Sequence, residues 1–130
     1  MSETSILVVD DNPTNLKLVS DVLEFDGYRI LKASDAEEAQ ELIKGSLPDL
    51  ILMDIALPGM DGLTLTRQLK ADSKTRDIVI VALTAFAMKG DDDKARAAGC
   101  DGYITKPIDT RKLSASVAEY LLRRGAGRQV

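Results

Sequence analysis

The chain has 130 residues, of which 45% are hydrophobic, and this content suits one domain with a buried core and leaves no room for a second. Its 21 acidic and 17 basic side chains give a net charge of −4 without a long basic run, so nucleic acid and anionic membranes are poor electrostatic partners. The sequence contains no histidine, which excludes histidine-based nucleophilic triads, histidine-rich zinc sites and phosphohistidine carriers.

Short apolar runs rich in Val, Ile and Leu alternate along the chain with longer stretches in which apolar residues recur at helical spacing. The runs predict strands at residues 6–9, 29–33, 50–53, 78–83 and 102–105. Three of them are almost continuously apolar, which is typical of parallel strands that are buried on both faces.

The first two predicted helices begin with capping signals. Asn12 followed by Pro13 is typical of an N-cap with proline at the first helical position. Residues 34–37 match the Ser-x-x-Glu capping box, and Gly45 is expected to close that second helix.

The remaining helix starts are acidic. Asp61 and Gly62 open the third predicted helix, residues 91–93 place negative charge at the start of the fourth, and Asp109 can cap the fifth. We expect the fifth helix to end before Gly125, so that residues 1–124 form the domain and 125–130 form a short flexible C-terminal tail.

Strict alternation of strands and helices implies right-handed crossovers and a parallel sheet covered on both faces. The predicted fold is therefore an α/β protein, a three-layer α/β/α sandwich around a five-stranded parallel sheet. If the strand order is 2-1-3-4-5, the ligand crevice lies at the carboxyl ends of strands one and three, where the order reverses.

The polar residues of interest each follow or end a predicted strand. They are Asp10 and Asp11 after the first, Asp54 after the third, Thr84 after the fourth and Lys106 after the fifth. Three carboxylates that lie close together repel one another unless a cation balances them, and magnesium favours such oxygen ligands. Lys106 and Thr84 could bind phosphoryl oxygens, so the set favours phosphoryl transfer onto Asp54.

Each of these residues also has a structural interpretation when it is taken alone. An isolated Asp-Asp-Asn after a strand is usually a turn and a helix cap, and Thr84 or Lys106 alone is more often structural. Tyr103 would more often be a core residue, and Cys100 is expected to be a small buried side chain. The combination at the strand ends favours a site.

Four segments carry a family resemblance, and they are residues 10–12, 52–62, 82–85 and 103–107. In order and spacing they resemble the receiver domain of two-component response regulators, whose fold is CheY-like and flavodoxin-like. The resemblance covers almost the whole chain. It implies a phosphoacceptor switch and not a conventional enzyme, one that catalyses its own phosphotransfer and a slow self-dephosphorylation.

By this resemblance, Asp54 receives a phosphoryl group from a partner histidine kinase or histidine phosphotransferase. Magnesium, for which manganese could substitute, would be bound by Asp10, Asp11, Asp54 and the backbone carbonyl of Ala56. Lys106 would bind the phosphoryl group.

The resemblance also implies a switch. Thr84 would move towards the phosphoryl group and Tyr103 would turn inward, which would remodel the face formed by the fourth helix, fifth strand and fifth helix. A downstream protein would bind that face. The bond between Lys106 and Pro107 matches the family's cis-peptide site, which fits the tolerance of proline for a cis bond.

Two positions that vary within the family are Ala56 and Phe86 here. Ala56 has no polar atom to orient an attacking water, and Phe86 could shield the acyl phosphate. These residues lead to the hypothesis of slow self-dephosphorylation.

Three other functions compete with this one. Phosphohydrolases of the haloacid dehalogenase type use Asp-x-Asp at the nucleophile, whereas residues 54–56 lack the second acid. A flavin carrier of the same topology needs a phosphate loop that the acidic residues 10–11 would disfavour. A scaffold that is never phosphorylated is disfavoured by the intact acidic set.

The longest apolar stretches fall short of the roughly 18 residues of a membrane span, and residues 1–5 are too short for a secretory signal, so we expect a cytoplasmic location without membrane insertion.

Overall fold

A computed structural model describes residues 4–55, 62–84, 91–106 and 108–128, and for 91–92 and 123–128 it describes only the backbone. The strands are β1 (Ser5–Val9), β2 (Arg29–Ala33), β3 (Leu50–Asp54), β4 (Val79–Thr84) and β5 (Gly102–Thr105). The helices are α1 (Pro13–Phe25), α2 (Ala36–Gly45), α3 (Gly62–Ala71), α4 (Asp91–Ala98) and α5 (Thr110–Arg128). The predicted alternation is confirmed, with strand ends displaced by at most one residue.

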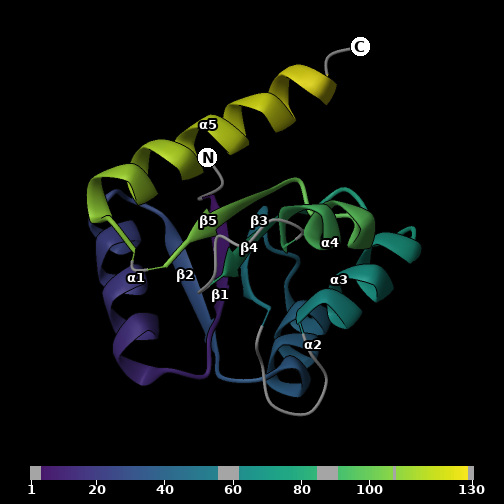
Figure 1. Ribbon diagram of the computed structural model, residues 1–130, viewed down its shortest axis with the longest axis horizontal. Coiled ribbons are helices and arrows are strands. Elements are labelled where there is room, and N and C mark those ends of the chain that lie inside the picture. Colours follow the sequence, from purple (N-terminus) through teal and green to yellow (C-terminus); the bar gives the residue numbers. More distant parts are fainter. Residues whose placement is uncertain (1–3, 56–61, 85–90, 107, 129–130) are drawn as a thin grey trace.

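The sheet has the order β2-β1-β3-β4-β5, and each neighbouring pair is parallel, as predicted. Helices α1 and α5 cover one face, and α2, α3 and α4 cover the other (Figure 1). Strands β1, β3 and β4 are buried along their whole length, which explains their continuous apolar runs. The molecule is therefore a three-layer α/β/α sandwich.

Successive residues of β1 divide between two cores because side chains alternate along a strand. Ile6 and Val8 pack with Val19 of α1 and Leu113 of α5. Leu7 and Val9 belong to the second core, which α2, α3 and α4 cover. Both cores hold the carboxyl ends of β1 and β3 in fixed positions.

Most helix caps agree with the sequence. The side chain of Asn12 accepts hydrogen bonds from the backbone N–H groups of Thr14 and Asn15, with Pro13 beginning α1. Asp109 accepts from the N–H groups of Arg111 and Lys112 at the start of α5.

The capping box of α2 was predicted one residue too early. Asp35, not Ser34, is the N-cap, and its carboxylate accepts the N–H of Glu38 at 2.8 Å. The Glu38 side chain accepts the N–H of Ser34 at 2.8 Å. Both Ser34 and Asp35 are good capping residues with glutamate three positions later, so the motif fits either register.

The predicted end of the last helix was also wrong, because α5 continues through Gly125 to Arg128. Gly125 and Gly127 both lie within α5, and each glycine costs only about 1 kcal/mol in a helix, which does not by itself end one. Whether residues 125–130 behave as a flexible tail stays a prediction.

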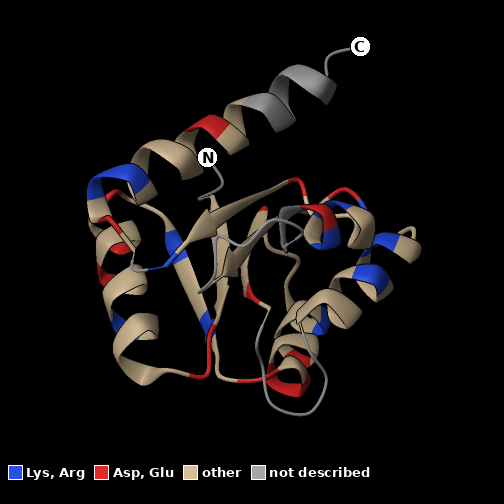
Figure 2. Cartoon of the chain, viewed as in Figure 1, with Lys and Arg blue, Asp and Glu red and all other residues tan. Residues whose placement is uncertain are grey.

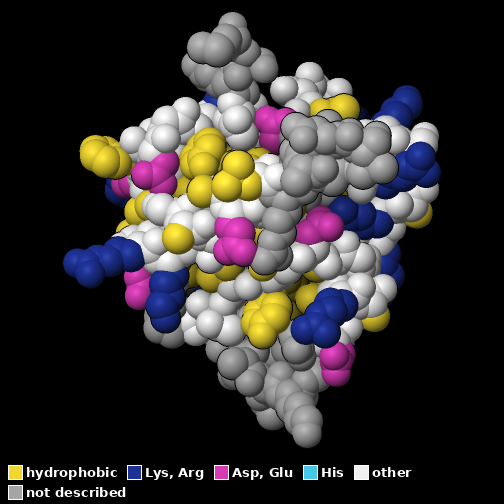
Figure 3. Space-filling model, turned by 90° about the horizontal axis from the view of Figure 1, so that it is seen from above, with side chains coloured by type: hydrophobic (Ala, Val, Ile, Leu, Met, Phe, Trp, Pro, Cys, Tyr) yellow, Lys and Arg dark blue, Asp and Glu magenta, His cyan; other side chains and the backbone are white. Residues whose placement is uncertain are grey.

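Charged residues are unevenly placed relative to the sheet. Acidic residues gather at the edge where β1 leads into α1 and β2 leads into α2 (Figure 2). On the face seen in Figure 3, basic and acidic side chains are interspersed. None of the described helices has an apolar stretch long enough to span a membrane.

Candidate functional site

The candidate site begins with two aspartates at neighbouring strand ends. In the parallel pairing of β1 with β3, Val9 lies opposite Met53, and Asp10 and Asp54 are the next residues along each strand. Asp10 is fully buried, and Asp54 is 3% exposed. Burying two carboxylates side by side is costly unless positive charge is near.

Lys106 provides that positive charge. Its ammonium nitrogen lies 3.1 Å from Oδ2 of Asp54, to which it donates a hydrogen bond, and 3.3 Å from Oδ2 of Asp10. The backbone positions it, because the N–H of Lys106 donates to the carbonyl of Thr84 at 2.7 Å just beyond β5. One lysine therefore contacts both buried acids.

A third carboxylate completes the cluster. One oxygen each of Asp10, Asp11 and Asp54 lies within 4.8 Å of the others, and Asp11 is exposed at the rim. Oδ1 of Asp10 accepts the N–H of Asn12 at 2.9 Å, but its buried Oδ2 accepts no hydrogen bond despite the nearby ammonium. A buried oxygen with a free lone pair among three carboxylates fits a hard divalent cation such as magnesium.

The pKa shifts of Asp10 and Lys106 reflect the same excess of negative charge. Burial, together with the charge of Asp54, raises the pKa of Asp10, although the N–H of Asn12 and the charge of Lys106 oppose this. Burial alone would lower the pKa of Lys106, but its hydrogen bond to Asp54 and the charges of both acids raise it. The ionised carboxylates thus exceed the positive charge that the described residues supply.

Thr84 and Tyr103 lie on the neighbouring strands. Thr84 ends β4, is 4% exposed and pairs with Thr105, one position beyond the residue that pairs with Asp54. Tyr103 lies in β5 and is 42% exposed, so it is not the core residue that its composition alone favoured. It lines a cavity of about 300 Å³ between α4, β5 and α5, together with Arg96 and Tyr120.

Some predicted site residues lie outside the described residues. They are Ala56, Phe86 and Pro107. Their predicted roles in metal binding, dephosphorylation and the cis peptide bond stay predictions.

Two residues near Asp54 were not predicted as part of the site. Gly62 was interpreted only as a helix start, yet it packs against the backbone of Asp54. Thr66 is fully buried and donates a hydrogen bond to the carbonyl of Gly62 at 2.8 Å. The only sequence signal was a glycine at a first helical position, where proline is the commoner specialist.

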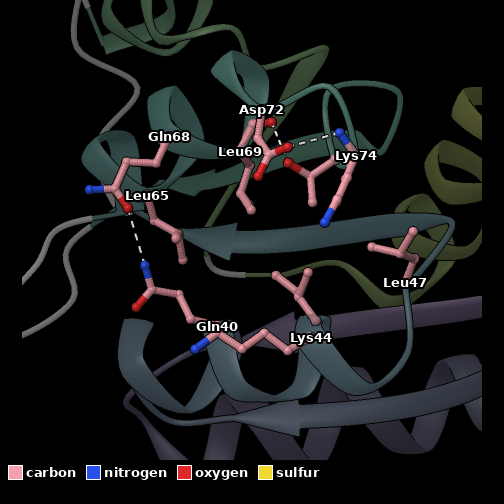
Figure 4. Close-up of a pocket in the computed structure, with 10 residues that line it drawn as sticks. Gln40, Lys44, Leu47, Leu65, Gln68, Leu69, Asp72 and Lys74 are labelled. Carbon is pink, nitrogen blue, oxygen red and sulfur yellow. Dashed lines mark hydrogen bonds between the residues drawn. The ribbon is translucent and has the colours of Figure 1, made fainter.

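A larger cavity, of about 670 Å³, lies between α2 and α3 away from the acidic cluster (Figure 4). Leu65 and Leu69 of α3 contribute apolar surface, and the side-chain amides of Gln40 and Gln68 are hydrogen-bonded across it at 3.1 Å. None of the predicted site residues lines it. This cavity is therefore separate from the acidic cluster at the strand ends.

Comparisons with known proteins agree with this geometry. The model of the response regulator receiver domain matches residues 6–118. The polar-differentiation response regulator DivK of Brucella anthropi is 44% identical over 117 residues, which cover 90% of this chain and 95% of DivK.

Solved structures give the same result. A CheY-like response regulator receiver domain protein from Methanospirillum hungatei has a TM-score of 0.89 and 30% identity, covering 97% of this chain and 99% of that one. The receiver domain of a signal transduction histidine kinase from Syntrophus aciditrophicus has a TM-score of 0.83 and 33% identity, covering 91% and 89%. The family match favours the receiver interpretation over the phosphohydrolase and flavin-carrier interpretations.

Proposed function

Because the chain belongs to the response regulator receiver family of two-component signalling, we propose that Asp54 accepts a phosphoryl group from the phosphohistidine of a partner histidine kinase or histidine phosphotransferase. The observation that carries the proposal is the contact of one lysine with two buried carboxylates, of which one keeps an oxygen that accepts no hydrogen bond. Buried polar oxygens are usually hydrogen-bonded, so such an oxygen beside two further carboxylates favours a bound cation.

Asp10, Asp11 and Asp54 would hold magnesium or manganese, with the backbone carbonyl of Ala56 as a further ligand. When bound, the ion would neutralise charge on the phosphoryl oxygens and on the carboxylates. Lys106, already 3.1 Å from Asp54, would bind a phosphoryl oxygen as a fixed point charge. Thr84 would donate its hydroxyl to another phosphoryl oxygen.

During transfer, a carboxylate oxygen of Asp54 forms a bond to phosphorus while the bond from phosphorus to the donor nitrogen breaks. This reaction needs positioning and charge neutralisation rather than a histidine base, which fits a chain without histidine. The burial of Asp54 excludes bulk water from one side of the acyl phosphate.

The test is intact mass spectrometry after incubation with acetyl phosphate and magnesium. We expect one phosphoryl addition that requires magnesium, is absent in Asp54→Asn and is removed by hydroxylamine. An addition that persists in Asp54→Asn, or that forms equally well in EDTA, would refute the proposal.

Slow loss of the phosphoryl group is the second part of the proposal. Ala56 offers no polar atom to an attacking water, so Ala56→Asn should speed dephosphorylation. We propose that Phe86 would shield the acyl phosphate in the parent. First-order loss of the phosphoryl group from purified protein measures this rate. Rapid loss from the parent, unchanged by Ala56→Asn, would contradict it.

We further propose that a downstream protein binds the face of α4, β5 and α5. The exposed Tyr103 beside a cavity of about 300 Å³ supports this, since the cavity offers space for an inward rotation. Phosphorylation should change the backbone amide signals of β5 in NMR spectra of the parent and not of Asp54→Asn. A cytoplasmic location also stays a prediction.

A further inference from the structure

Gly62 approaches the phosphoacceptor strand too closely for any side chain. A Cβ atom at this position would overlap the carbonyl oxygen of Asp54 and lie 2.9 Å from Cγ of Met53. Among the described glycines, only Gly27 and Gly99 have positive φ, so backbone conformation does not require glycine at position 62. The required property is the absence of a side chain.

Thr66 links Gly62 to the segment between α4 and β5. Its buried hydroxyl donates to the carbonyl of Gly62 at 2.8 Å, one helical turn earlier. On its other side, Sγ of Cys100 lies 4.0 Å from the same hydroxyl oxygen, at the turn between α4 and β5. The first turn of α3 is thus fixed between the end of β3 and the start of β5.

We infer that Gly62 and Thr66 are positioning residues for phosphorylation, which set the location of the Asp54 backbone and hence of its carboxylate. This inference rests on the proposed acceptor role of Asp54. A side chain at position 62 must displace either α3 or the end of β3, because the overlapping atom is backbone. The contact of Asp54 with Lys106 at 3.1 Å would then change.

Such a change would affect the rate in addition to any effect on folding. Group transfer depends on the alignment of the reacting atoms, and a displacement of about 1 Å can cost roughly a hundredfold in rate. A purely structural role predicts instead that variants lose activity only in proportion to their loss of stability.

The first experiment measures the phosphorylation rate with acetyl phosphate at saturating magnesium, far below each thermal transition. Gly62→Ala should be slower by at least about tenfold. Gly45→Ala is the matched control, because a Cβ at Gly45, also a helix terminus, meets nothing within 4 Å. Leu69→Ala removes a buried side chain of α3 without approaching Asp54 and controls for destabilisation of the helix.

The second experiment separates the hydroxyl of Thr66 from its volume. Thr66→Val keeps the shape but removes the donor to Gly62, and we expect it to be slower by about three- to tenfold. Thr66→Ser keeps the donor and should retain a rate within about twofold of the parent. Rescue by serine is an outcome that a purely packing role does not produce.

The outcomes are distinct. If the parent and Gly45→Ala are not phosphorylated, the proposed function fails. If they are phosphorylated and folded Gly62→Ala reacts within twofold of them, or Leu69→Ala is slowed as much as Gly62→Ala, the positioning role is refuted.

Discussion

At the scale of single residues, the burial of Asp10 in the proposed site is expected to lower the stability of the chain. Asp10 is fully buried, its Oδ2 accepts no hydrogen bond, and burial together with the charge of Asp54 raises its pKa. A raised carboxyl pKa means that the ionised form is less favourable in the folded chain than in the unfolded one. Without a metal ion, Asp10 should therefore lower the free energy of unfolding.

We predict that Asp10→Asn raises the free energy of unfolding in EDTA at pH 7, by roughly 1 kcal/mol. The amide oxygen can still accept the N–H of Asn12 while the repulsion from Asp54 is removed. Urea denaturation measures the difference. Asp11→Asn, at an exposed position, should change stability less.

The sign of the pH dependence follows from the raised pKa. The folded chain binds the Asp10 proton more tightly than the unfolded chain, so the cost of ionisation is full above the raised pKa. It disappears as the pH falls through that value towards the ordinary 3.8. The advantage of Asp10→Asn should shrink over the same range, and saturating magnesium should reverse it at pH 7. A variant that is less stable than the parent in EDTA at pH 7 would contradict the prediction.

Two equally buried hydroxyls give a second prediction at this scale. The hydroxyl of Ser20 in α1 forms no hydrogen bond with a described residue, whereas that of Thr66 is bonded to Gly62. Ser20→Ala should raise the free energy of unfolding by about 1 kcal/mol, because it removes an unsatisfied polar group and improves helix propensity. Thr66→Val should lower it by a similar amount, since it leaves the carbonyl of Gly62 without that donor. Thermal denaturation should show shifts of opposite sign, and shifts of the same sign would count against the explanation.

At the scale of secondary-structure elements, periodicity was informative and boundaries were less so. The apolar runs located every strand, and they are most continuous in β1, β3 and β4, which are buried along their whole length. The start of α2 was misplaced by one residue because adjacent Ser34 and Asp35 satisfy the same motif. The end of α5 was misplaced because a glycine such as Gly125 lowers helix propensity but does not by itself end a helix.

The corrected register of α2 can be tested with two adjacent substitutions. Asp35→Ala should lower the free energy of unfolding by about 1 kcal/mol, because it removes the acceptor for the N–H of Glu38 and a favourable charge near the helix N-terminus. Ser34→Ala should have an effect below about 0.5 kcal/mol, since Ser34 contributes its backbone N–H and not its side chain. Equal losses in the free energy of unfolding for the two variants would instead favour the register predicted from the sequence, with Ser34 as the N-cap.

At the scale of the whole molecule, the carboxyl ends and the amino ends of the strands hold different groups of residues. The carboxyl edge holds the acidic cluster, and Lys70 connects elements at the opposite edge. Its ammonium donates to the carbonyls of Arg76 and Ile78 and to Oδ2 of Asp101, which also accepts the N–H of Ile80 at 2.8 Å. One side chain thus joins the end of α3 to the starts of β4 and β5.

We predict that Lys70→Met lowers the free energy of unfolding by about 2 kcal/mol and leaves the phosphorylation rate within about twofold of the parent. The stability loss reflects hydrogen bonds from a charged, mostly buried donor, and the retained rate reflects its position at the other edge. Lys74→Met is the matched control, since Lys74 is exposed and its ammonium pairs with no described residue. A rate that falls together with stability would show that the two edges are coupled.

The site was predictable to the extent that topology brings strand ends together. Asp10, Asp54 and Lys106 each end or follow a strand, so the parallel order alone places them at one edge. The sequence could not predict which residues contact one another. Examples are the close contact of Gly62 with the Asp54 backbone and the contact of Lys106 with both acids. Such contacts depend on packing between elements distant in sequence.

The place of β5 at the margin of the sheet, after the other four strands in chain order, has a consequence for the newborn polypeptide. While β5 and the residues after it are still inside the ribosome, the carboxylate of Asp54 lacks the ammonium group of Lys106. On the proposed function, a phosphohistidine donor would therefore meet a complete site only after β5 and Lys106 have been synthesised and folded.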